Sequence, residues 1–187
     1  MDNMSGIDFV ICTYNRSAYL KECITSLLPQ MVPAKTCLTV VDNCSTDDTK
    51  EWVLELTKVN PVVRYLYQPE QGLSHARNKA WRESPFDWIF YIDDDCLPPT
   101  DFVNAALQLI QEFTRFDALG GPISALYEHV SPHWMPEGFG SFSMAYHQVT
   151  QLENGFIRGG CFLIRRKILE DFGGFKTDLG VRGDALR

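Results

Sequence analysis

The feature that most constrains the fold is an alternation of two patterns along the chain. Apolar runs of strand length occupy residues 7–13, 37–41, 62–67 and 88–92. Apolar residues at helical spacing follow each run, over residues 17–28, 45–56, 72–82 and 102–113. Nearly continuous apolar strands joined by amphipathic helices are typical of parallel sheets covered on both faces. The alternation therefore predicts an α/β fold, with a mostly parallel sheet and helices on both faces.

The pattern changes in the later part of the chain. Residues 118–123 predict a further strand, whereas residues 124–155 lack periodicity and contain several Pro, Gly and aromatic residues. We expect a long irregular excursion there, a kind of segment that is often functional. Its aromatic side chains fit either a local core or contact with a substrate. Strand character returns over residues 156–164, and residues 166–172 predict a short helix ended by a Gly-Gly pair.

Two helix starts carry capping signals. Ser17 is the expected N-cap of the first helix, and the polar residues 45–48 supply a cap and an acidic first turn for the second.

Length and composition limit the class of protein. With 187 residues and 45% hydrophobic residues, the chain fits a single globular domain with its own core. A net charge of -7 without a basic block excludes nucleic acid as a favoured partner. The six cysteines show no paired spacing, which favours a reducing compartment over a disulfide framework or a zinc site. Because no run approaches the ~20 apolar residues of a membrane span and the start lacks secretory features, we expect a cytoplasmic protein, with peripheral membrane contact left open.

Polar residues follow three of the predicted strands. In an open parallel sheet, ligands bind beyond the carboxyl ends of the strands, so these residues should converge on one crevice. They are Thr13, Tyr14, Asn15 and Arg16 after the first strand, Asp42 and Asn43 after the second, and Asp93, Asp94 and Asp95 after the fourth.

The three consecutive aspartates are the chemical centre of the sequence. Adjacent carboxylates repel one another unless a cation lies among them, and oxygen ligands at an open site suit Mg²⁺ or Mn²⁺ with a diphosphate. A solvated acidic turn is the alternative. Asp42 has a similar alternative as a helix-capping loop acid, and Arg77 as a surface residue of its helix. Gly159 and Gly160 predict either a bulge that lets a ligand approach or simple packing.

The sequence order supports neither a Ser-His-Asp nor a Cys-His arrangement, which favours phosphoryl or glycosyl transfer over acyl transfer. Four motifs then occur in order, at residues 11–16, 40–47, 72–78 and 91–95. Together they resemble the inverting nucleotide-sugar glycosyltransferases of family 2, whose domain has the Rossmann-like glycosyltransferase A-type fold. Weaker similarity continues through residues 159–162 and 173–175.

The resemblance implies roles for individual residues. Thr13 and Tyr14 would hold the nucleoside, Asp42 would hydrogen-bond the base, and Arg77 would lie near the donor. In the DxD motif, Asp95 would ligate the divalent cation, with Asp93 at the ribose or in the metal shell. The predicted donor-binding set is Thr13, Tyr14, Asn15, Arg16, Asp42, Asn43, Arg77, Asp93, Asp94, Gly159 and Gly160.

The resemblance also divides the domain. Residues 1–99 would form a nucleotide-sugar-binding half and residues 100–187 an acceptor-side half. An inverting transfer needs a carboxylate that takes the proton of the acceptor hydroxyl. The family supplies it beyond a Gly-Gly-Phe segment, where Asp178 and Asp184 are the late candidates, although neither lies in an acidic pair. Because family domains are usually longer, we expect the sequence to be truncated at its C-terminus.

The expected function is transfer of a sugar from a nucleotide sugar, a UDP-sugar in the first place, to a saccharide or lipid-linked acceptor with inversion. Polysaccharide or glycoconjugate synthesis is the process that the resemblance suggests. Two alternatives stay open. One is a donor-binding fragment without catalysis, and the other is a sugar nucleotidyltransferase, against which the lack of a Gly-rich, basic loop after the first strand counts.

Overall fold

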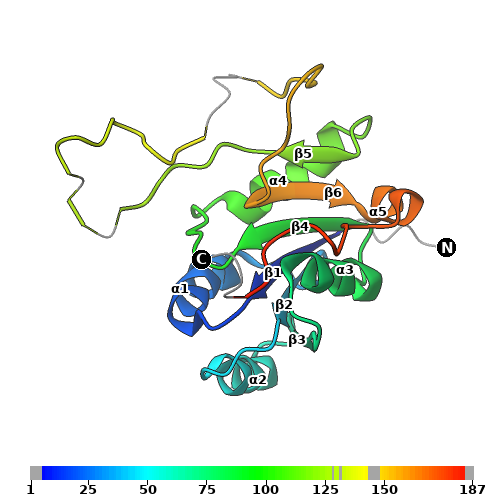
Figure 1. Ribbon diagram of the computed structural model, residues 1–187. Helices are drawn as coiled ribbons and strands as arrows, with labels where there is room; N and C mark the ends of the chain where they lie inside the picture. Colours follow the sequence, from blue (N-terminus) through cyan, green and yellow to red (C-terminus); the bar gives the residue numbers. More distant parts are fainter. Residues whose placement is uncertain (1–5, 128, 131, 143–147, 184–187) are drawn as a thin grey trace.

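A computed structural model of the chain describes residues 6–127, 129, 130, 132–142 and 148–183. It confirms a mixed α/β fold with a six-stranded, mostly parallel sheet in the order β3-β2-β1-β4-β6-β5 (Figure 1). In chain order the elements are β1 (Ile7–Thr13), α1 (Ser17–Leu27), the short 3₁₀ helix η1 (Leu28–Gln30), β2 (Thr36–Asp42), α2 (Thr49–Val59), β3 (Val63–Tyr67), α3 (Leu73–Glu83), β4 (Trp88–Asp93), α4 (Phe102–Glu112), β5 (Ala118–Gly120), β6 (Cys161–Arg165) and α5 (Arg166–Phe172).

The pairing of the strands fixes which polar residues meet. β1 pairs in parallel with β2 and with β4, so Thr13 lies opposite Asp42 and Cys12 lies opposite Asp93. β6 is antiparallel to β4, and its first residue, Cys161, pairs with Ile92. The carboxyl ends of β1, β2 and β4 and the start of β6 therefore share one edge of the sheet.

The strands β1 to β4 and β6 alternate their side chains between two apolar cores, one on each face of the sheet. Phe9 and Ile11 of β1 are fully buried against apolar residues of α1, α2 and α4. Its neighbour Val10 contributes to the opposite core, with Ala76 and Trp81 of α3 and apolar residues of β6 and α5. Helices thus cover both faces, as the alternating pattern predicts.

Several local predictions were wrong. The strand expected over residues 118–123 ends at Gly120. The helix α2 begins only at Thr49 without a side-chain cap, so Glu51 and not residues 45–48 supplies the acid of its first turn. Ser17 is the first residue of α1 and not its side-chain cap; its backbone N–H instead donates to Asp47 Oδ2 of the β2–α2 loop at 2.9 Å. The strand expected over residues 156–164 begins only at Cys161, because Gly159 and Gly160 form a turn before it. A Cβ atom on Gly160 would lie 2.7 Å from Asp93 Oδ2, so the close approach here is to a neighbouring side chain.

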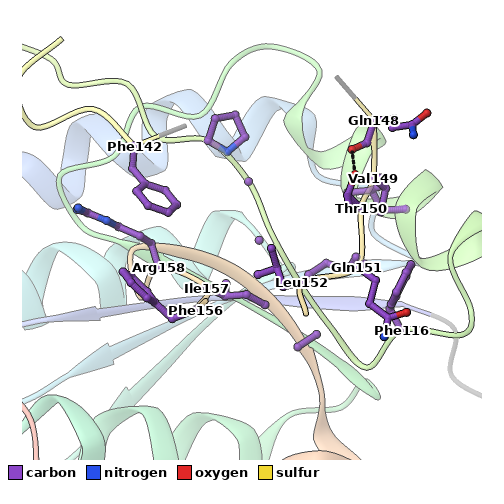
Figure 2. Close-up of a pocket in the computed structure, with 16 residues that line it drawn as sticks. Phe116, Phe142, Gln148, Val149, Thr150, Gln151, Leu152, Phe156, Ile157 and Arg158 are labelled. Carbon is purple, nitrogen blue, oxygen red and sulfur yellow. Dashed lines mark hydrogen bonds between the residues drawn. The ribbon is translucent and has the colours of Figure 1, made fainter. Parts of the chain in front are cut away.

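The excursion after β5 lies at the far edge of the sheet from β3 (Figure 1). Its described part is irregular apart from a bridge between Ile123 and Phe142. A cavity of about 620 Å³ lies between β5, the end of α4 and this segment. Figure 2 shows the residues that line it. Phe116, Phe142 and Phe156 line it, and Arg158 stacks on the Phe142 ring at 4.8 Å.

The last described segment, residues 175–183, returns across the start of α3. Leu73 N–H donates to Val181 O at 2.9 Å, and Ser74 Oγ donates to Leu179 O at 3.0 Å. Within the described ranges, no helix has the length and apolar character needed to span a bilayer.

Candidate functional site

The loops after β1 and β2 are tied together by one side chain. Asn15 adopts a φ of 54°, a left-handed conformation that Asn tolerates better than most residues. Its Oδ1 accepts the backbone N–H of Thr46 at 2.6 Å, and its own N–H donates to Ser45 Oγ at 3.0 Å. The Asn15 side chain therefore holds the two loops in register at the carboxyl edge of the sheet.

Asp42, at the end of β2, is almost fully buried, with 1% exposure. Its Oδ1 accepts Ser45 N–H at 2.8 Å, and its Oδ2 accepts the Tyr65 hydroxyl at 2.8 Å. Burial, followed by the hydrogen bond to Asp42, raises the pKa of Tyr65, so that this hydroxyl stays a donor. The sequence did not point to Tyr65, because its contact with Asp42 spans two strands. The predicted contact between Asp42 and a nucleotide base stays a prediction.

Asn43 uses its amide inside the protein. Its Nδ2 donates to Gln68 O at 3.1 Å and to Glu70 O at 2.8 Å, while its Oδ1 accepts Gly72 N–H at 2.7 Å. Gly72 has a φ of 144°, which favours glycine at this helix start. Asn43 thereby fixes the entry into α3, and any part it takes in donor binding is a prediction.

In the acidic turn after β4, the Asp94 carboxylate is buried, whereas those of Asp93 and Asp95 are partly exposed. Asp94 points inward, where its Oδ2 accepts the Thr13 hydroxyl at 2.8 Å and its Oδ1 lies 2.9 Å from Arg16 Nη1. Burial raises the pKa of Asp94 to about 6, although Thr13 and Arg16 favour the ionised form. The ends of β1 and β4 are therefore joined by a buried carboxylate.

Asp93 and Asp95 keep about half of their side chains exposed, at 48% and 47%. Partial burial raises the pKa of Asp93, with Arg77 acting against this and Asp95 reinforcing it. No group of three or more His, Cys, Asp or Glu side chains arranged to hold a metal ion occurs among the described residues. Two accessible carboxylates nevertheless match the usual donor set for Mg²⁺, which takes one or two carboxylates and completes its shell with water and phosphate oxygens.

Arg77 of α3 lies in an aromatic cage and not on the surface. Its guanidinium lies 5.4–5.6 Å from the centroids of the Tyr91, Phe162 and Phe175 rings. Nη2 donates to Gly159 O at 2.7 Å and lies 3.7 Å from Asp93 Oδ1. With its side chain 14% exposed, Arg77 holds the Gly159–Gly160 turn against the end of β4.

The late acidic candidates are only partly described. Asp178 is exposed, in the segment that crosses α3, whereas Asp184 lies outside the described residues. Asn78 holds the start of this segment, since its Nδ2 donates to Phe175 O at 2.7 Å and its Oδ1 accepts Phe175 N–H at 2.8 Å.

A cavity of about 680 Å³ opens beside Asp95, toward α1 and α4. Arg16 and Asp95 lie on its polar side, and Tyr19 and Phe102 supply aromatic walls. The edge of the sheet thus combines a pair of accessible carboxylates, a neighbouring guanidinium and a large adjacent hollow.

The family model "Glycosyl transferase family 2" matches residues 8–173 of the chain. The succinoglycan biosynthesis protein ExoM of Rhizobium meliloti is 29% identical over 95% of this chain and 57% of its own length. The glycosyltransferase AglE of Haloferax volcanii is 25% identical over 95% of this chain and 58% of its own length. The chain thus spans a little over half the length of these relatives.

Solved structures confirm the fold. Residues 1–349 of TarS from S. aureus superpose with a TM-score of 0.74 at 21% identity, covering 94% of this chain and 52% of that one. The mannosyltransferase PcManGT from Pyrobaculum calidifontis, solved with GDP-Man and Mn²⁺, gives a TM-score of 0.64 at 22% identity, covering 94% and 49%.

Proposed function

The chain belongs to glycosyl transferase family 2, and from this membership we propose that it transfers a sugar from a nucleotide sugar to an acceptor hydroxyl with inversion. The proposed donor is a UDP-sugar and the proposed acceptor a saccharide or lipid-linked saccharide, in polysaccharide or glycoconjugate synthesis. TarS, which shares the fold, was solved with UDP-GlcNAc, and poly-β-1,6-N-acetyl-D-glucosamine synthase of Staphylococcus aureus is 23% identical over 64% of this chain and 28% of its own length.

The observation that carries the proposal is the convergence of three strand ends on two accessible carboxylates. Thr13, Asp42 and Asp94 are buried and hydrogen-bonded within the protein, which leaves Asp93 and Asp95 directed to the edge where ligands bind. A rigid base of buried contacts beneath two exposed acids is suited to holding a charged ligand in one orientation.

In this proposal Asp95, with Asp93 beside it, would hold a divalent cation. Such a cation, when bound, supplies positive charge to the diphosphate leaving group. Thr13, Tyr14 and Asp42 would orient the nucleoside across the ends of β1 and β2. The buried Asp42–Tyr65 pair and the Asn15 bridge keep those two loops at a fixed separation, which limits the positions that the nucleoside can take.

The acceptor would approach from the part of the chain after β4, residues 100–187. We propose the hollow beside Asp95 as its entrance, since the aromatic side chains of Tyr19 and Phe102 are among the residues that line it. The base that takes the acceptor proton is left unassigned, with Asp178 and Asp184 as candidates. The reaction would take place in the cytoplasm, with any membrane contact peripheral.

The test is a calorimetric titration of the chain with UDP, GDP and dTDP, each with Mn²⁺ and again with EDTA. We expect UDP to bind with Mn²⁺ and to lose most of its affinity with EDTA. Incubation with UDP-sugars and candidate acceptors should then yield UDP and a glycoside with inverted anomeric configuration. Absence of nucleotide binding would contradict the proposal. Binding without turnover would favour a donor-binding module, and pyrophosphate release from UTP and a sugar phosphate would favour a nucleotidyltransferase.

A further inference from the structure

The guanidinium of Arg16 contacts Asp95, the carboxylate that is proposed to bind the divalent cation. Its Nη2 donates to Asp95 Oδ2 at 2.8 Å, and its Nη1 lies 2.9 Å from Asp94 Oδ1. One planar fork therefore spans two adjacent carboxylates, a geometry that Arg provides and Lys does not. The acidic turn is already neutralised in part by a side chain of this protein.

Both ends of this bridge are well anchored. Arg16 precedes α1, and its carbonyl accepts Leu20 N–H at 3.0 Å, so the helix fixes its backbone. Its guanidinium also stacks on the Tyr19 ring at 4.7 Å. On the other side, Asp94 is 6% exposed and is held by Thr13.

The Arg16 side chain is only partly enclosed. Its side chain is 41% exposed, and it lines the hollow beside Asp95, which offers room for a second position. Asp95 itself is 47% exposed, so the contact between the two can be exchanged for water or an ion without unfolding the turn.

We propose that Arg16 is a resident counter-cation of the acidic turn, and that a divalent cation binds Asp95 by displacing the Arg16 guanidinium from it. The inference rests on the proposed function, because it takes Asp95 as a ligand of that cation. Arg16 acts here as a positioning residue: it keeps the two carboxylates from repelling each other while no donor is bound, and it weakens cation binding in that state.

The first test measures Mn²⁺ binding to the nucleotide-free protein, from the electron paramagnetic resonance signal of free Mn²⁺. We expect Arg16→Gln to lower the Kd for Mn²⁺ by about tenfold, because the competing charge-assisted bonds are lost. Arg16→Lys should give an intermediate value, since an ammonium cannot span both carboxylates in the same way. Lys21→Gln is the matched control: it removes one positive charge from α1, the helix that Arg16 precedes, and Lys21 pairs with Asp48 instead of the acidic turn. Its Kd should stay within about twofold of the unmodified protein.

Three results would overturn the proposal. The first is that Arg16→Gln binds Mn²⁺ no more tightly than the unmodified chain. The second is that Lys21→Gln gains as much affinity for Mn²⁺ as Arg16→Gln does. The third is that none of the proteins binds Mn²⁺. The UDP titration described above, run on the same samples, separates this failure from failure of the proposed function. If Arg16→Gln binds UDP normally but its Kd for Mn²⁺ is unchanged, the role proposed for Arg16 is wrong and the proposed function still stands.

A second measurement follows the Arg16 side chain in the unmodified protein. The side-chain ¹⁵N signal of Arg16, assigned by its absence in Arg16→Lys, should shift as Mg²⁺ is added. Arg64, whose Nη2 donates to Glu83 O at 2.8 Å, is the internal reference and should not shift. An Arg16 signal that stays unchanged up to Mg²⁺ saturation would show that the cation does not displace it, against the proposal.

Discussion

The part of the chain up to β4 and the part after α4 use their apolar side chains in opposite ways. In the first part the side chains of β1, β2 and β4 are almost all buried, and Phe9 stacks on Phe90 with ring centroids 5.5 Å apart. Beyond α4, large apolar side chains lie exposed, among them Val130 at 97% and Trp134 at 67%. The difference teaches that the sheet and its carboxyl edge are stabilised by their own packing, whereas we expect the excursion to use its apolar groups mainly for contact with other molecules.

The largest expected effect concerns the carboxyl edge. Asp95→Asn should lower turnover by about 10²–10³-fold, because it removes a charged ligand where the leaving group develops negative charge. UDP titration with Mn²⁺ and a transfer assay measure this. Asp101→Asn is the control, since Asp101 is exposed and lies outside the acidic turn. Unchanged Mn²⁺-dependent UDP binding by Asp95→Asn would mean that the assigned role is wrong.

A pair of truncations tests the contrast between the two parts directly. Phe9→Ala should lower the free energy of unfolding by about 3–5 kcal/mol, because it leaves a cavity between β1, β4 and α4. Trp134→Ala should change it by no more than about 0.5 kcal/mol, as expected for an exposed site. Urea denaturation gives both values, and a similar loss in the two variants would break the comparison.

Arg77 joins the two parts, since Tyr91 belongs to β4 whereas Phe162 and Phe175 come from beyond α4. Arg77→Met should cost about 2 kcal/mol of stability, through the lost cation–π contacts and the freed Gly159 carbonyl. Hydrogen exchange should rise over residues 159–175 and not over β2. Arg82→Met, on the exposed side of the same helix, serves as the control, and equal exchange in both variants would argue against a linking role for Arg77.

The smallest expected effect is a pH dependence of the free energy of unfolding, which comes from a buried group in the part of the chain up to β4. Asp8 of β1 is fully buried, and this burial raises its pKa, although hydrogen bonds from Thr39, Cys37 and Ser84 and the charge of Arg64 lower it. Because the folded value lies above the unfolded value of about 3.9, the stability from this group is present below about pH 4 and falls as pH rises through the folded pKa.

Replacing the Asp8 carboxyl group should remove this pH dependence of the free energy of unfolding. The advantage of Asp8→Asn over the unmodified chain in free energy of unfolding should grow as the pH rises above about 4, the unfolded pKa of the carboxyl group. Urea denaturation at several pH values measures it. Parallel curves for the two proteins would show that Asp8 does not titrate across this range.

Local patterns predicted the elements well wherever a residue's neighbours in sequence decide its state. The apolar run over residues 88–92 became β4, longer by one residue, and the periodicity over residues 72–82 became α3, shifted by one. The sequence failed where a distant partner decides. Ser17 looked like a cap, but Asp47, thirty positions away, accepts its N–H, and the start of β6 depends on its antiparallel pairing with β4.

The same distinction applies to the candidate site, where some features could be predicted from the sequence and others could not. The convergence of Thr13, Asp42 and Asp94 followed from topology, because the ends of parallel strands share an edge. The inward turn of Asp94 and the aromatic cage around Arg77 could not be read from the sequence, because both depend on side chains contributed by several elements. A positive φ at Asn15 was detectable in principle, since Asn in a loop is a common signal for it.

The strand order has a consequence for the newly made chain. β4 becomes a partner of β1 early in synthesis, but its other partner, β6, follows only after the whole excursion. Until the ribosome has released residues 161–165, β4 is an unprotected edge strand with an almost wholly apolar sequence, a form that invites pairing with a second chain. A nascent chain that has not yet completed β6 should therefore be more prone to self-association than one that has.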